Sequence, residues 1–183
     1  MVTAMRLKHL KTVITGRPGI GKTTLVRKTL ESLAPVVAAG FFTTEIREKG
    51  RRVGFQMQGL NGERGILSHV RISGASRIGK YGVDTAAFEE FLGRLDLPSP
   101  GVTLVVIDEI GKMELLSNLF RNLVTELLNS AKPLLATIAL EGGEFIGEIK
   151  RRKDIFLVEL TFHNRDRLLR EILAPSAHGL RQG

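Results

Sequence analysis

Short apolar runs alternate with segments of helical periodicity along most of the chain. Five of the runs have the length of buried strands, and they occupy residues 11–15, 36–42, 103–107, 133–140 and 155–160. Apolar residues at helical spacing follow them and predict helices over residues 23–33, 83–95, 114–129, 144–152 and 165–173. Strands that alternate with helices are typical of an α/β protein with a largely parallel sheet.

One segment breaks this alternation. Residues 43–70 contain no helical pattern, and Gly50 and the Asn61-Gly62 pair are turn signals within them. We expect an antiparallel hairpin or meander inserted between the second strand and the next helix. The sequence contains no linker, so we expect one domain over residues 1–183, with flexible tails at 1–10 and 174–183.

The strongest chemical signal is the stretch GRPGIGKTTL, which begins at Gly16. It matches the phosphate-loop pattern GxxxxGK[ST], and it lies between a predicted strand and a predicted helix, as that pattern requires. Glycines let the backbone amides turn inward and approach a phosphate, and the helix N-terminus adds free N–H groups. Lys22 is then placed to reach the β- and γ-phosphates, and the Thr23 hydroxyl to bind Mg²⁺.

Two acids end the apolar run at 103–107. Asp108 is placed to hold magnesium, since ligands bind at the carboxyl ends of the strands in such sheets. Glu109 is placed to polarise a water for attack on the γ-phosphorus. The alternatives are a helix-capping role for Asp108 and a structural acid or salt bridge for Glu109.

The amino-acid composition limits the classes of protein to which the chain can belong. The 183 residues are 43% hydrophobic and 25% charged, an ordinary globular balance for one domain. Neither a spanning helix nor a signal peptide is apparent, so we expect a cytoplasmic protein without membrane partners. Cysteine is absent, which excludes disulfides and thiolate metal sites, and scarce Asn and Gln resemble thermophile usage. The histidines, which show no metal-ligand spacing, are His9, His69, His163 and His178.

The net charge widens the range of partners. Lys and Arg number 27 against 19 Asp and Glu, a formal charge of +8 that favours polyanionic ligands. The densest clusters are Arg51-Arg52 and residues 150–153. Nucleic acid is therefore a candidate partner, and a solvated basic face is the alternative.

Nearly the whole chain, from Lys11 to about Leu173, resembles the small P-loop nucleoside-triphosphatases, a family that includes the cancer-related nucleoside-triphosphatase and thermophilic homologues. The matching stretches are GRPGIGKTTL, GFFTTEIREKGRRVGF, YGVD, VIDEIGKMEL and FHNRD. The resemblance implies a RecA-like α/β fold and Mg²⁺-dependent hydrolysis of nucleoside triphosphates to diphosphates, with tolerance of several bases.

The resemblance also implies nucleotide contacts in two segments. Those in the first are Gly16, Arg17, Pro18, Gly19, Ile20, Gly21, Lys22, Thr23 and Thr24. Those in the second are Val105, Val106, Ile107, Asp108, Glu109, Ile110, Gly111 and Lys112.

Several polar residues have two interpretations each. Lys112 either stabilises transition-state charge at the γ-phosphate or pairs with Glu114. Thr43, Thr44, Glu45 and Arg47 form either a switch-like segment or an ordinary hairpin start. Asn164 and Arg165 contact the base, or Asn164 caps the last helix. Arg77, Lys80 and Tyr81 either close over the site or belong to a loop without a direct role.

The leading function is hydrolysis of nucleoside triphosphates by a protein that we expect to be a monomer. A nucleotide or small-molecule kinase on the same fold is the second hypothesis, although the only lid-like basic cluster, at 150–153, comes late in the chain. A nucleic-acid-linked ATPase is the third, because of the positive charge.

Overall fold

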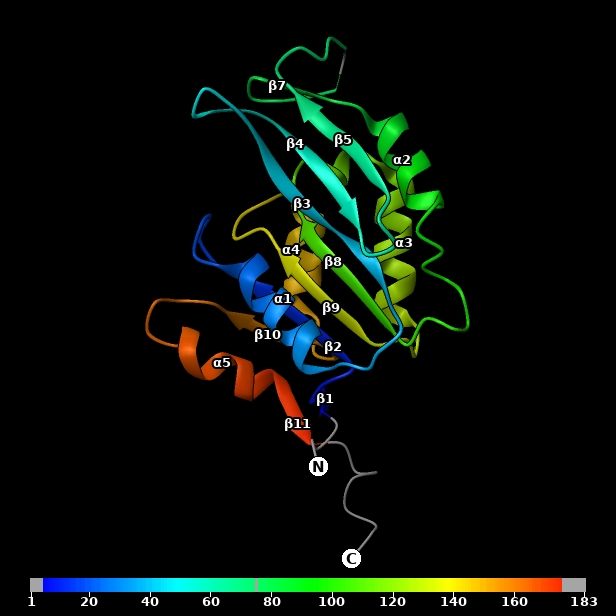
Figure 1. Cartoon of the computed structure of the whole chain (residues 1–183), viewed down its shortest axis with the longest axis vertical. Coiled ribbons are helices and arrows are strands. Elements are labelled where there is room, and N and C mark those ends of the chain that lie inside the picture. The colour runs from blue at the N-terminus through cyan, green and yellow to red at the C-terminus, as the bar shows by residue number, and fades with distance from the viewer. Residues whose placement is uncertain (1–4, 75, 176–183) are drawn as a thin grey trace, which may run out of the picture.

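A computed structural model describes residues 5–74 and 76–175, in which helices cover both faces of a nine-stranded sheet (Figure 1). The predicted α/β class is confirmed. The sheet runs in the order β10-β2-β9-β8-β3-β4-β5-β7-β6. Its parallel half contains β10 (Phe156–Glu159), β2 (Lys11–Thr15), β9 (Leu134–Ile138), β8 (Leu104–Ile110) and β3 (Ala38–Glu48).

Successive side chains on the parallel strands enter two separate hydrophobic clusters, because side chains alternate between the faces of a strand. Val13 packs in one cluster and Ile14 in the other. Helices α1 (Lys22–Ser32) and α5 (Arg165–Ile172) cover the face of Ile14. The opposite face is covered by α2 (Thr85–Gly93), α3 (Asn118–Asn129) and α4 (Glu144–Arg151).

The antiparallel half continues the same sheet. Strand β3 begins at Ala38, two residues later than predicted, and runs on to Glu48. It pairs in parallel with β8 through Phe42 and in antiparallel with β4 from Phe41 onward. One strand therefore joins the two halves. The predicted meander forms β4 (Arg51–Gly59) and β5 (Arg64–His69), and two strands beyond the predicted insertion, β7 (Tyr81–Val83) and β6 (Arg77–Ile78), complete the sheet.

Near the acids, two further elements differ from their predicted limits. Strand β8 extends to Ile110 and includes both acids, whereas the sequence predicted its end at residue 107. The helix predicted over 114–129 is divided into a 3-10 turn, η1 (Glu114–Leu116), and α3. Ser117 causes the break, because its Oγ accepts from the Phe120 N–H at 3.0 Å and caps α3.

The predicted tails are partly ordered. Strand β1 (Met5–Leu7) pairs in antiparallel with β11 (Leu173–Pro175), and the two form a separate small sheet. This pairing joins segments from opposite ends of the chain, so no local pattern reveals it. Residues 1–4 and 176–183 lie outside the described residues, and so does His178. In the described part of the chain, every helix is too short or too polar to span a bilayer.

Gly40 allows β3 to approach β8. Its φ is +142°, and a Cβ there would lie only 1.8 Å from the Val106 carbonyl oxygen. We expect Gly40→Ala to lower the free energy of unfolding by about 3 kcal/mol or more, through steric overlap and backbone strain. Urea-induced unfolding measures this free energy in the wild type and the variant. The control is Gly93→Ala at the end of α2, where a Cβ meets nothing within 4 Å; an equal loss in both variants would contradict the assignment.

Candidate functional site

The phosphate-loop sequence forms the connection between β2 and α1. Gly21 is the N-cap of α1, and its φ of +106° is a left-handed conformation that glycine adopts without strain. No side chain caps this helix, so its first N–H groups are available to an anion. Gly16 lies against the chain after β10, since a Cβ on it would come within 2.7 Å of the Leu160 carbonyl oxygen. Ile20, which is buried, anchors the loop in the core.

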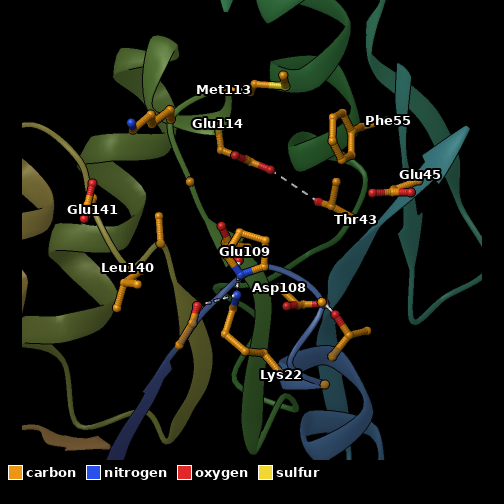
Figure 2. Close-up of a pocket in the computed structure, with 18 of the residues that line it drawn as sticks. Lys22, Thr43, Glu45, Phe55, Asp108, Glu109, Met113, Glu114, Leu140 and Glu141 are labelled. Carbon is orange, nitrogen blue, oxygen red and sulfur yellow. Dashed lines mark hydrogen bonds and ion pairs between the residues drawn. The ribbon is translucent and has the colours of Figure 1, made fainter. Parts of the chain in front are cut away.

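The Lys22 side chain extends across the open end of this loop. Its Nζ donates to the Gly16 carbonyl at 3.1 Å and lies 3.3 Å from Oε2 of Glu109 (Figure 2). The lysine side chain is 10% exposed, so its charge faces the pocket rather than bulk water. The amine and the second acid therefore meet where a phosphate on the loop would end.

Asp108 is held by two hydroxyl groups from different elements. Its Oδ2 accepts from Thr23 Oγ1 at 2.6 Å, and its Oδ1 accepts from Thr137 Oγ1 at 2.5 Å. The carboxyl is buried, and burial raises its pKa, while the two hydrogen bonds and nearby Lys22 oppose that rise. Because β9 lies between β2 and β8, Thr137 reaches the acid from the intervening strand.

Glu109 follows Asp108 through a cis peptide bond and faces Lys22. Burial raises the pKa of Glu109, and the charge and hydrogen bond of Lys22 oppose this effect. A carboxylate with an elevated pKa beside a lysine has the properties of a general base.

A pocket of about 800 Å³ contains these groups. One wall is the phosphate loop with Lys22, Thr23 and Thr24. The opposite wall comes from the antiparallel half and from the segment after β8, and it includes Thr43, Glu45, Arg52, Phe55, Ile78, Lys112, Met113 and Glu114. The inserted strands thus form part of the pocket in addition to extending the sheet.

Within the switch-like segment, alternation of the strand separates the side chains. Thr43 and Glu45 line the pocket, whereas Thr44 is on the other face of β3. Glu45 pairs with Arg47 at 2.6 Å and with Arg52 at 2.8 Å, and the hydrogen bond from Arg52 lowers its pKa.

Lys112 and the loop near Tyr81 also have defined positions. Lys112 is exposed on the pocket wall, and no ion pair joins it to Glu114 in the described residues, because Glu114 is buried and faces Thr43. Tyr81 is buried, and its hydroxyl accepts from Arg52 Nε at 2.9 Å. Arg77 donates to backbone carbonyls of its own loop, so neither of these side chains is free to close over the site.

Some predicted contacts lie away from the pocket. Four members of the second segment are fully buried in the core and line no part of it: Val105, Val106, Ile107 and Ile110. Arg17 and Ile20 do not line it either.

The loop after β10 also lies outside the pocket lining. Asn164 is at the N-cap position of α5 but makes no side-chain capping bond. Its amide instead donates to the Glu159 carbonyl at 2.7 Å and accepts from the Thr161 N–H at 2.8 Å. Arg165 is exposed beside it.

Two residues of the site were not identified from the sequence. Thr137 is a lone hydroxyl in a strand of apolar residues, and that polar exception was its only signal. Glu114 was considered solely as a partner for Lys112. In residues 5–74 and 76–175, no group of three or more His, Cys, Asp and Glu side chains is arranged to hold a metal.

The basic clusters are partly neutralised within the chain. Arg52 pairs with Glu45, and Arg152 pairs with Asp154 at 2.5 Å. Lys150 donates to the Leu140 carbonyl at 2.6 Å. The two ion pairs reduce the charge that the clusters offer to an external polyanion, whereas the carbonyl contact leaves the charge of Lys150 in place.

Comparison with known proteins agrees with this geometry. A family model described as NTPase matches residues 11–173. The nucleoside-triphosphatase THEP1 of Thermotoga sp. strain RQ2 is 45% identical over 166 residues, which cover 90% of this chain and 94% of that protein.

Two solved structures are also similar. The crystal structure of THEP1 from Aquifex aeolicus has a TM-score of 0.75 and 37% identity, and the match covers 88% of this chain and 96% of that one. The solution structure of a human cancer-related nucleoside triphosphatase has a TM-score of 0.72 and 40% identity, and the match covers 88% of this chain and 94% of that one. The chain therefore belongs to this nucleoside-triphosphatase family.

Proposed function

We propose that the protein hydrolyses nucleoside triphosphates, ATP and GTP among them, to the diphosphate and phosphate in an Mg²⁺-dependent reaction. The observation that carries this proposal is the pairing of Glu109 with Lys22 at the open end of the phosphate loop. Glu109 accepts a proton from water while the water oxygen bonds to the γ-phosphorus. The bond from the γ-phosphorus to the bridging oxygen breaks, and the diphosphate leaves with the electron pair.

Thr23 and Asp108 are the proposed magnesium ligands. Their oxygens lie 2.6 Å apart, and a hydroxyl beside a carboxylate is the type of oxygen donor pair that Mg²⁺ prefers. The ion fits this position because the carboxylate is buried and without a salt-bridge partner in the described residues. Bound there, magnesium would neutralise charge on the β- and γ-phosphates.

Two lysines supply the remaining positive charge. Lys22 is held at the loop by Gly16 and binds the β- and γ-phosphates. Lys112, on the opposite wall of the pocket, stabilises the charge that develops on the γ-phosphoryl group. Both lysines lie in the same chain, so a monomer suffices for this chemistry.

Broad base tolerance is part of the proposal. The candidate base contacts Asn164 and Arg165 lie outside the pocket lining. The Asn164 amide is already bonded to Glu159 and Thr161. Stacking on Arg165 discriminates little among bases, because every base has a π-face.

Phosphate release from ATP, GTP, CTP and UTP, each with Mg²⁺ and with excess EDTA, tests the proposal. We expect turnover with all four triphosphates, within about tenfold of one another, and at least a 10²-fold loss without Mg²⁺. Phosphate transfer to an added nucleoside or nucleotide would favour a kinase instead. Acceleration by RNA that disappears with salt would favour a nucleic-acid-linked ATPase.

A further inference from the structure

Glu114 is a buried carboxyl on the pocket wall without a cationic partner. Its exposed fraction is 5%, and among the described residues it takes part in no salt bridge. Its Oε1 accepts from Thr43 Oγ1 at 3.4 Å, a bond that joins η1 to β3 across the pocket (Figure 2). An isolated charge at such a position would be strongly disfavoured.

A second acid, Glu109, lies near Glu114. A Cβ on Gly111 would lie 2.7 Å from Glu114 Oε2 and 3.3 Å from Glu109 Oε1, so the two carboxyl groups face each other across this glycine. Glu109 has Lys22 at 3.3 Å, and Glu114 has no equivalent. Two neighbouring carboxyl groups with different partners favour one ionised and one protonated group.

The remaining charges near Glu114 do not alter this assignment. They lie on α2, α3 and β8, which pack against η1, on β3, and in the loop before η1, and they are Asp108, Glu45, Glu89, Arg121 and Lys112. Arg121 donates to the Leu115 carbonyl, and Arg52 and Arg47 bind Glu45. Lys112 is exposed to water. Burial, together with the negative charges of Glu109 and Asp108, raises the pKa of Glu114 to about 8, against the opposing hydrogen bonds from its own backbone N–H and from Thr43.

We propose that Glu114 is a positioning residue for hydrolysis, which acts as a neutral carboxylic acid that holds Thr43 and packs beside the Glu109 carboxylate. The inference rests on the proposed hydrolytic function. Loss of the Glu114 proton places another negative charge beside Glu109 and near the γ-phosphate. That charge repels the substrate and displaces the base, so turnover requires protonated Glu114.

The pH profile of kcat tests this inference. Between about pH 7 and 10 the substrate phosphates stay ionised, so their titration does not contribute. We expect kcat of the wild type to fall about tenfold per pH unit above about pH 8. Glu114→Gln keeps a neutral side chain of the same shape, and it should retain kcat within about threefold at pH 7 and remain flat to about pH 9.5.

Thr43→Val supplies an independent test. The Thr43 bond lowers the pKa of Glu114, so its removal should move the alkaline fall in kcat to higher pH, the same direction as Glu114→Gln. The matched control is Glu126→Gln, an exposed acid on α3, which should reproduce the wild-type profile.

The outcomes are distinguishable. An unchanged alkaline fall in Glu114→Gln overturns the inference, and so does a folded Glu114→Gln variant that is inactive at pH 7. If that variant does not fold, a Thr43→Val profile identical to the wild type overturns it equally. A wild type that releases no phosphate at any pH contradicts the proposed function itself.

Discussion

Glutamine in place of Glu109 is expected to lower kcat by about 10²- to 10⁴-fold, the range that a general base contributes. The amide keeps the shape of the side chain and its contact with Lys22, but it cannot take a proton from water. Affinity for the magnesium–triphosphate complex should change less than about threefold, because the phosphate loop and Asp108 are untouched. Single-turnover phosphate release together with titration calorimetry separates the two quantities.

The control for this experiment is Glu144→Gln in the exposed first turn of α4. It changes the net charge of the protein equally and should leave both kcat and affinity unchanged. Turnover by Glu109→Gln at the wild-type rate would show that Glu109 is a structural acid. The base would then have to be sought elsewhere in the pocket.

The half of the site formed by the phosphate-loop sequence and the two acids could be predicted because its signals are local. The residues from Gly16 to Thr23 are consecutive, and the strand and helix that flank them have clear periodicity. Asp108 and Glu109 likewise directly follow a continuous apolar run. Each signal needs only a short window of sequence.

The other half of the site depends on which strands are neighbours, and no local pattern gives that. Thr43 meets Glu114 only because β3 lies next to β8, and Thr137 meets Asp108 only because β9 lies between β2 and β8. The predicted limits of the second strand were wrong for a related reason. The sequence pattern predicts that residues 43–48 begin a new hairpin, but their pairing with β4 makes them a continuation of β3.

The sheet order also explains how the two adjacent acids come to contact different groups. Since β9 separates β2 from β8, the loop and the acids start two strands apart, and the side chains of Thr23 and Lys22 reach Asp108 and Glu109 across that separation. Thr137 supports Asp108 from β9, which leaves Glu109 free to turn toward Lys22. The side on which the nucleobase is expected is less constrained. There the Asn164 amide stabilises its own turn and does not project toward the pocket.

Methionine in place of Lys22 should reduce kcat/KM by about 10³-fold or more. The triphosphate loses a charge-assisted contact, and the transition state loses a cation in a site where charge is worth more than in water. Glu109 also loses its only ion-pair partner within the described residues, at 3.3 Å. Methionine retains the apolar part of the side chain, so packing along α1 should be preserved, and the melting temperature should fall by only a few degrees.

Lys28→Met on the same helix is the control, because Lys28 is exposed and the substitution removes the same charge. The double variant Lys22→Met/Glu109→Gln gives the sharper measurement. If lysine and glutamate act as one unit, the double variant should be little worse than the more damaged single variant, since the second change removes a group that already lacks its partner. Losses that multiply would mean that Lys22 and Glu109 act independently, although their side chains are in contact.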